Sequence, residues 1–282
     1  MAKIEFKNVN YIYNQKTSKE TRALCDVNLK IDDGEFLAII GHTGSGKSTL
    51  IQLMDGLLKG ATGEILVDGK NIEDKDFNKR ELRKKVGLVF QNPENQLFEE
   101  TVLKDVCFGP KNMGLSNEEA EKKAIEALKL VEVPKESYDK SVFELSGGQK
   151  RRVAIAGVLA MDPEVLILDE PTSGLDPQGR NMIMEQVKKL HEEKGISIVW
   201  VSHNMEQVAL HAKRIVVMND GKVAMDDTTR NIFARGDELE QMGLKVPQVT
   251  SVMHELKSAG LDVDTSVLSV EEAKDNLLKV LK

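Results

Sequence analysis

The sequence predicts an α/β fold with a parallel sheet at its centre, an antiparallel sheet near the N-terminus and a small helical extension at the C-terminus. Uninterrupted apolar segments, EFLAIIG, VLILDE and ISIVWVSH, predict strands buried on both faces, and amphipathic segments between them favour parallel pairing. Polar and apolar residues alternate between residues 3 and 31, which predicts antiparallel strands. After residue 230 the pattern changes to short helical pieces broken by glycine and proline. We therefore assign residues 1–230 to one domain and residues 231–282 to the extension.

The first predicted strands are KIEFKNV and RALCDVNLKI, and GEILVDGKNI repeats their alternation before an Asp-Gly turn. The buried strand EFLAIIG follows, and after it KSTLIQLMDGLL carries apolar residues at helical spacing from Leu50 to Leu58. This order predicts a strand, a glycine loop and a helix.

The middle of the chain predicts a helical subdomain over residues 92–160. SNEEAEKKAIEALKLV begins with a capping box, Ser116 to Glu119, and ends before Pro134. A second S-x-x-Q cap, Ser146 to Gln149, begins a helix with a buried stripe. The stripe consists of Val153, Ile155, Ala156 and Leu159. Beyond it we expect the helix NMIMEQVKKLHEEKG between two buried strands, and then the hairpin RIVVMNDGKVAMD.

Composition narrows the function. The 282 residues are 40% hydrophobic and 30% charged with a formal net charge of −7, which disfavours a general nucleic-acid binder. No apolar run reaches the length of about 18 residues that would predict a membrane span. Cys25 and Cys107 form no CxxC pair, so we expect two buried thiols in a reducing compartment.

A phosphate-binding loop is predicted at GHTGSGKS, which fits G-x-x-x-x-G-K-[ST] between a buried strand and an amphipathic helix. Backbone N–H groups of such a loop converge on an anion, Lys47 adds a positive charge and Ser48 can bind Mg²⁺. His42 could be a catalytic base, but we interpret it as a spacer. The loop residues are Gly41, His42, Thr43, Gly44, Ser45, Gly46, Lys47 and Ser48.

Polar residues at three strand ends complete the expected site. The apolar strand in VLILDEP is followed by two carboxylates. Asp169 is placed to bind a metal, and Glu170 is placed to polarise water at a γ-phosphate. The alternative is that the two acids form a solvated turn. His203 ends a strand expected beside that of Asp169, so we predict a hydrogen bond to the γ-phosphate instead of a purely structural role. Gln91 follows VGLVF and could bridge Mg²⁺ and water.

LSGGQ predicts a second anion site, because two glycines leave the helix N-terminus bare beside a serine hydroxyl. The phosphate loop at GHTGSGKS already provides this domain with a site for its own nucleotide. The second anion site therefore suits a nucleotide that is held by another subunit. Its residues are Leu145, Ser146, Gly147, Gly148 and Gln149.

GHTGSGKST, Gln91, LSGGQ, VLILDEP, SGLD and His203 together resemble the ATP-binding-cassette (ABC) ATPases over residues 1 to about 230. The resemblance implies a P-loop NTPase fold with a RecA-like core, and a head-to-tail dimer that sandwiches two ATP molecules with Mg²⁺. It implies that Tyr13 stacks on adenine, with Tyr11 as the alternative, that Thr49 belongs to the ATP site, and that Asp176 lies at the dimer interface.

GLVFQNPENQLFEETVLKDVCFGPKNMG is similar to the energy-coupling factor (ECF) ATPases. GHTGSGKST together with LFEETVLKDVCFGP is similar to the second of their two paralogues. This implies ATP hydrolysis that powers uptake of vitamins or transition-metal ions. The implied partners are a paralogous ATPase, or a second copy, plus a transmembrane coupling subunit and a substrate-binding membrane subunit. The chain would lie at the cytoplasmic face of the membrane and not touch the solute.

Other ABC classes are weaker alternatives. An importer ATPase for another solute, such as an amino acid or phosphate, is the main one. DNA-repair, chromosome-tethering and translation cassettes fit less well, because the chain has no long heptad region and a single cassette. The extension, residues 231–282, either packs on its own domain or contacts the partner ATPase; we favour the contact.

Overall fold

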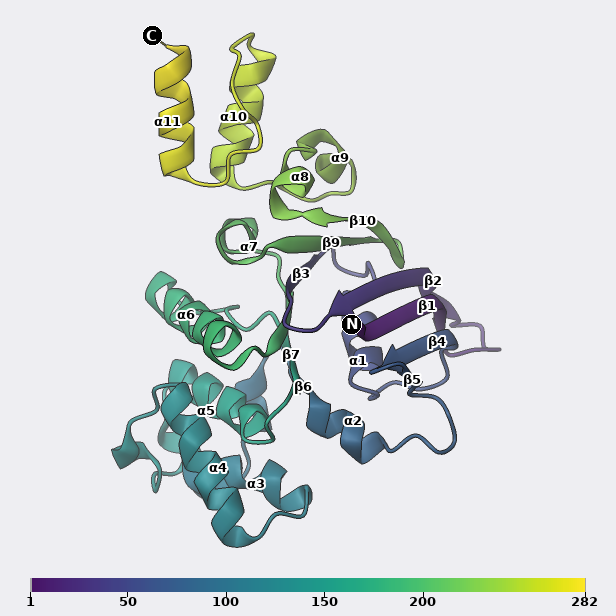
Figure 1. Ribbon diagram of the computed structural model, residues 1–282, viewed down its shortest axis with the longest axis vertical. Helices are drawn as coiled ribbons and strands as arrows, with labels where there is room; N and C mark the ends of the chain where they lie inside the picture. Colours follow the sequence, from purple (N-terminus) through teal and green to yellow (C-terminus); the bar gives the residue numbers. More distant parts are fainter. Residues whose placement is uncertain (1, 282) are drawn as a thin grey trace.

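The central sheet of the computed structural model, which describes residues 2–281, has six strands in the order β10-β9-β3-β8-β7-β6 (Figure 1). All neighbours pair in parallel except β9 and β10, which form the predicted hairpin. The strands are β3 Phe36–Ile40, β6 Val86–Val89, β7 Val165–Asp169, β8 Ser197–Val201, β9 Arg214–Asn219 and β10 Lys222–Thr228. The predicted parallel sheet is confirmed.

Both faces of this sheet are buried, which explains the continuous apolar segments. Alternate residues of β3 enter different cores: Leu37 and Ile39 face the core shared with the antiparallel sheet, while Ala38 and Ile40 face the helical side. Helix α1 (Lys47–Met54) belongs to the first core; α6 (Pro177–Lys194) and α7 (Met205–His211) belong to the second. The strand-end residues of the site are therefore held between two packed layers.

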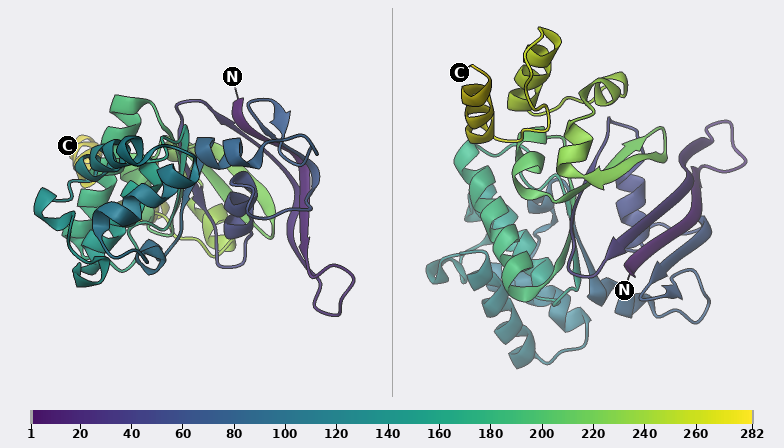
Figure 2. Two further views of the ribbon diagram at one scale, coloured as in Figure 1. Left: turned by 90° about the horizontal axis from the view of Figure 1, so that it is seen from below. Right: turned by 45° about the horizontal axis from the view of Figure 1, so that its top comes forward.

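The second sheet, of order β2-β1-β4-β5, is antiparallel and lies at the N-terminus as predicted. Its strands are β1 Ala2–Tyr13, β2 Thr21–Asp32, β4 Thr62–Val67 and β5 Lys70–Asn71. Figure 2 shows this sheet and the helical region on opposite sides of the central sheet.

The helical region consists of α3 (Val102–Asn112), α4 (Asn117–Leu130) and α5 (Gly147–Leu159), with the short 3₁₀ turns η1 (Pro93–Gln96), η2 (Lys135–Ser137) and η3 (Val142–Glu144). Helix α2 (Lys79–Lys85) precedes β6, and its Leu82 belongs to the core shared with the antiparallel sheet. Both predicted capping boxes are formed, at Ser116–Glu119 and at Ser146–Gln149. The predicted stripe of α5 is buried. The start of α5 is thus fixed by its own side chains.

The chain after β10 packs in two parts. Helices α8 (Thr229–Phe233) and α9 (Gly236–Gln241), with the segment to Val246, join the main core. Helices α10 (Gln248–Ser258) and α11 (Val270–Val280) instead share a small core of their own and stand at one end of the molecule (Figure 1). The packing therefore changes between Val246 and α10, whereas the domain limits given above stay a prediction.

Two local predictions were wrong. Helix α1 ends at Met54, not near Leu58, and Leu57 is exposed. Cys25 is only partly buried, whereas Cys107 is buried. Ser269 and Glu272 of α11 also have the S-x-x-E spacing of a capping box, but only the hydroxyl of Ser269 caps the helix, and the carboxylate of Glu272 pairs with Arg230. Within residues 2–281, no helix has both the length and the apolarity to cross a membrane.

Candidate active site

The phosphate loop follows β3 and ends at the N-terminus of α1. A Cβ at Gly41 would lie 2.4 Å from the carbonyl oxygen of Met218, so only glycine fits there. Gly46, the N-cap of α1, has a φ of 103° and is also in close contact with β2. The ammonium of Lys47 donates to the carbonyls of Gly41 (2.7 Å) and His42 (2.9 Å). These contacts hold the positive charge of Lys47 over the loop.

The turn between β9 and β10 supports this loop from behind. The N–H of Gly221 donates to the carbonyl of Ser45 at 3.1 Å, and Nε2 of His42 lies 3.1 Å from Oδ1 of Asn219. His42 is therefore engaged with the turn. Its interpretation as a spacer stays a prediction.

A cavity of about 400 Å³ in front of the loop collects residues from five parts of the chain. The predicted residues that line it are Tyr13, Thr43, Gly44, Gly46, Lys47, Ser48, Thr49, Gln91, Asp169 and Glu170. Gly41, His42 and Ser45 do not line it, although they belong to the same loop. Thr21, Arg22 and Ala23 of β2 line the cavity and were not predicted. The pairing of Tyr13 with Thr21 across the first hairpin would have indicated them.

The two tyrosines of β1 are separated by their surroundings. The hydroxyl of Tyr13 lies 3.2 Å from Oγ1 of Thr49 and the ring lines the cavity. Tyr11 packs against the core and contacts the Tyr13 ring edge-on, with 4.9 Å between centroids. The placement favours Tyr13 as the adenine-stacking residue, and its role stays a prediction.

Two acids meet at the end of β7. Burial, and then the charge of Glu170, raise the pKa of Asp169 to about 6, while Lys47 opposes this. Burial lowers the pKa of Lys47, which both carboxylates counteract. Glu170 has a φ of 50°, a conformation that few non-glycine residues adopt and that is typical of functional sites.

His203 lies against this pair, as the predicted adjacency of β8 and β7 requires. Its Nδ1 is 2.6 Å from Oε2 of Glu170, but the two atoms are not aligned as a hydrogen bond and Oε2 has no hydrogen-bond partner. The ring of His203 is largely exposed. It can therefore turn toward a ligand without losing a packed position.

The residues fit a magnesium ion that also binds phosphate. The carboxylates of Asp169 and Glu170 line the cavity together with the hydroxyl of Ser48 and the amide of Gln91, so several oxygen donors face one space. Within residues 2–281, no three His, Cys, Asp or Glu side chains form a metal site by themselves. This donor set is typical of Mg²⁺, which binds one or two protein groups together with substrate phosphates.

The LSGGQ segment lies in a different place. Ser146, Gly148, Gln149 and Asp176 line a separate cavity of about 220 Å³ that shares no residue with the phosphate-loop cavity. The hydroxyl of Ser146 accepts a hydrogen bond from the N–H of Gln149 at 3.4 Å, and Oε1 of Gln149 accepts one from the N–H of Ser146 at 3.0 Å. The chain therefore does not bring LSGGQ to its own phosphate loop.

Comparison with known proteins identifies the family. Residues 24–173 match the family model described as ABC transporter. The chain is 53% identical to the energy-coupling factor transporter ATP-binding protein EcfA2 of Caldanaerobacter subterraneus subsp. tengcongensis, over 99% of this chain and 98% of that protein. It is 51% identical to EcfA2 of Clostridium perfringens with the same coverage. The chain belongs to the energy-coupling factor ABC transporter ATPases.

Solved structures agree with this assignment. The structure of cbiO1 from Clostridium perfringens, part of the ABC transporter complex cbiONQ, has a TM-score of 0.75 and 40% identity, covering 90% of this chain and 99% of that one. A dimeric ATP-binding cassette in a post-hydrolysis state with ADP and Pi has a TM-score of 0.70 and 35% identity, covering 80% and 98%. The chain thus has the ABC-type P-loop fold that its motifs implied.

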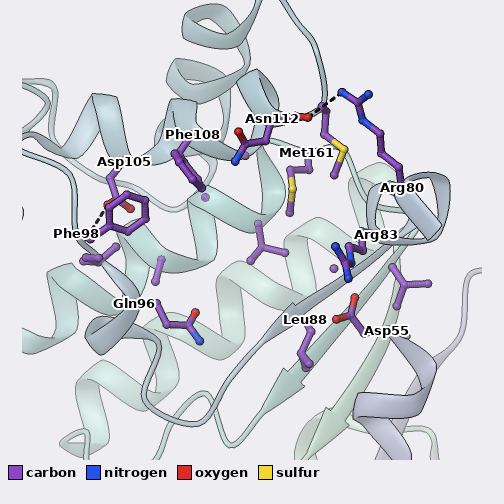
Figure 3. A pocket seen from close by; sticks show the side chains of 18 residues that line it. Asp55, Arg80, Arg83, Leu88, Gln96, Phe98, Asp105, Phe108, Asn112 and Met161 are labelled. Atoms are coloured by element: carbon purple, nitrogen blue, oxygen red, sulfur yellow. Dashed lines mark hydrogen bonds between the residues drawn. The ribbon is translucent and has the colours of Figure 1, made fainter. Parts of the chain in front are cut away.

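A third cavity, of about 650 Å³, lies between the helical region and the central sheet of this ABC ATPase (Figure 3). Phe98 and Phe108 pack edge-on at its rim with 4.8 Å between centroids, and they are 57% and 43% exposed. The carboxylate of Asp105 fixes the segment before α3 by accepting from the N–H groups of Phe98 (2.9 Å) and Glu99 (3.0 Å). We call this cavity the docking groove, because an exposed aromatic pair is typical of interaction surfaces.

Charged residues form the other wall of the docking groove. Asp55, Arg80 and Arg83 line it, as Figure 3 shows. Burial raises the pKa of Asp55 to about 7, and the charge of Arg83 only partly opposes this. Asp55, Arg80 and Arg83 belong to none of the motifs identified in the sequence.

Proposed function

We propose that the chain binds and hydrolyses ATP as one half of a head-to-tail ATPase dimer. The observation that carries the proposal is the separation of the phosphate-loop cavity from the LSGGQ cavity within one chain. Each cavity offers only part of what a triphosphate requires. In a head-to-tail pair, LSGGQ and Asp176 of one subunit would face the phosphate loop of the other, and both sites would be complete.

In each site, Glu170 would accept a proton from the attacking water and His203 would donate to the γ-phosphate. Ser48, Gln91 and Asp169 would hold Mg²⁺, which when bound offsets the negative charge of the phosphates. Tyr13 would stack on adenine, opposite Arg22 and its neighbours on β2. The raised pKa of Asp169 and the positive φ of Glu170 support a site arranged for a cation and a reacting water.

The partner ATPase would be a paralogue, with a second copy of this chain as the alternative. Helices α10 and α11 support such a contact, because Val252, Val270, Leu278 and Leu281 are exposed around a small shared core. Exposed apolar residues on a two-helix unit favour burial against a similar unit. Residues 231–282 would then hold the two ATPases together while the nucleotide sites open.

A transmembrane coupling subunit would occupy the docking groove, so the chain would lie peripherally at the cytoplasmic face. A separate membrane subunit would bind the vitamin or transition-metal ion. The ATPase would never contact this solute. Its contribution is ATP-driven closure, passed to the membrane through the groove.

The test is purification of the tagged chain from its native membranes, followed by identification of bound subunits and by uptake assays in proteoliposomes. We expect a paralogous ATPase, two membrane proteins and ATP-dependent uptake of a vitamin or metal ion. As a matched control, Phe98→Asp should release the membrane proteins but keep the paralogue. Uptake of an amino acid or phosphate by the purified assembly would assign the chain to another importer class.

A further inference from the structure

The side chain of Arg151 joins three functional segments of the chain. It lies on α5, two residues after LSGGQ, and is only 3% exposed. All of its polar atoms donate. Nε and Nη2 donate to the carboxylate of Glu94 at 3.2–3.3 Å, and Nη1 donates to the carbonyls of Pro171 at 3.1 Å and Ser173 at 2.5 Å.

The acceptors of the Arg151 guanidinium belong to two different functional segments. Glu94 is in η1, between Gln91 and the docking-groove residues Gln96 and Phe98. Pro171 and Ser173 directly follow Glu170, whose backbone is held at a φ of 50°. One guanidinium therefore connects η1, which borders the docking groove, with α5 and with the turn that carries Glu170.

The chemistry of the contact requires arginine. A guanidinium has five N–H donors in a rigid plane, and here they divide between a carboxylate on one side and two carbonyls on the other. Lysine has three donors on a flexible chain and cannot hold both sides in a fixed geometry. Because the guanidinium is buried, removing Glu94 leaves N–H donors without a partner, and removing Arg151 leaves two carbonyls without this donor.

We propose that Arg151 is a positioning residue that couples occupancy of the docking groove to the placement of Glu170. The proposal rests on the proposed function, in which a membrane subunit fills the groove. Movement of η1 displaces Glu94, the guanidinium follows, and the carbonyls of Pro171 and Ser173 move with it. The turn at Glu170 then changes position at the same time as the start of α5.

A purely structural clamp is the alternative, and two substitutions distinguish it. Glu94→Gln keeps the donors of Arg151 on the two carbonyls but removes the charge that ties them to η1. Arg151→Lys loosens both sides. In the assembled complex, we expect both variants to lower kcat about 10- to 100-fold with KM for ATP nearly unchanged, since small displacements of reacting groups cost rates of this size.

The decisive measurement is a double-mutant cycle on kcat, made in the ATPase dimer and again in the complex with the membrane subunit. In the dimer alone, Arg151→Lys lowers kcat and Glu94→Gln does not, because no partner acts through the groove. In the complex, the double variant is no slower than Arg151→Lys. Lys123→Met, which breaks an exposed ion pair with Asp162 in the same helical region, is the control and leaves kcat unchanged in both states.

The coupling role would be overturned if the losses in kcat from the two substitutions multiplied in the complex. It would also be overturned if Glu94→Gln lowered kcat equally with and without the membrane subunit, or if the variants lowered only the melting temperature. Failure of the wild-type dimer to bind any membrane subunit would refute the proposed function instead. In that case an unchanged kcat of Arg151→Lys in the dimer would still refute the positioning of Glu170 by Arg151.

Discussion

Replacing Asp55 by asparagine should stabilise the chain at neutral pH. The structure raises the pKa of this carboxyl from 3.8 to about 7, chiefly by burial. A tenfold change in proton affinity corresponds to about 1.4 kcal/mol, so the ionised group costs the folded chain up to about 4 kcal/mol. Because the side chain borders the open docking groove, water reduces this cost, and we expect a gain of about 1 to 3 kcal/mol for Asp55→Asn.

The stability difference between Asp55→Asn and the wild type depends on pH. Below about pH 4 the carboxyl is protonated in the folded and the unfolded chain, so the variant gains nothing from removing the charge. Between about pH 4 and pH 7 the unfolded carboxyl ionises while the folded one keeps its proton, so the stability of the wild type falls as the pH rises. Above about pH 7 both states are ionised and the difference stays constant.

Urea unfolding at pH 5 and pH 8 measures the effect. Asp55→Asn should be more stable than the wild type at pH 8, and the difference should shrink toward pH 5. The exposed Asp76→Asn is the matched control and should give no pH-dependent difference. A constant difference at both pH values, or a less stable Asp55→Asn at pH 8, would refute the argument that burial raises this pKa.

Three further predictions test the nucleotide sites and the extension. Glu170→Gln should retain ATP binding and lose turnover by about 10²- to 10⁴-fold, measured as phosphate release from the assembled complex; near-normal release would exclude Glu170 as the base. Ser146→Arg should abolish ATP-driven dimerisation in gel filtration while ATP affinity of the isolated chain stays unchanged; Ser146→Ala, which loses the same cap, controls for helix stability. Deletion of residues 248–282, which contain the small core shared by α10 and α11, should weaken nucleotide-free association of the two ATPases more than it weakens ATP binding. Equal sedimentation of truncated and full-length pairs would place the contact elsewhere.

The elements that could be predicted are those whose residue pattern is compatible with only one kind of secondary structure. Strands β3, β7 and β8 are apolar except at Asp169, the last residue of β7, and Ser197, the first residue of β8, because both faces of the sheet are covered. No exposed helix tolerates that pattern. The two capping boxes were equally definite, since each satisfies two backbone donors locally. The phosphate loop could be predicted because its function depends on a backbone geometry that few sequences can adopt.

The features that were missed depend on contacts between distant segments. Arg22 enters the nucleotide cavity through hairpin pairing, and Asp55 reaches the docking groove because α1 ends one turn earlier than its apolar spacing indicated. Arg151 is next to Arg152 in the sequence, yet Arg151 is buried against Glu94. No local pattern separates it from Arg152, because burial is decided by η1 and the turn after Glu170.

Some of the features that destabilise this chain lie where another subunit would bind. Asp55 is ionised at a price to the fold, Phe98 and Phe108 leave aromatic surface in water, and Glu170 keeps a backbone conformation that is unfavourable for its residue type. A cationic or apolar partner in the docking groove would offset the first two costs. By mass action, a ligand that binds only the folded state raises its stability, so the ATPase should gain stability on entering its complex. Destabilising residues in the groove thereby favour the assembled state over the free chain.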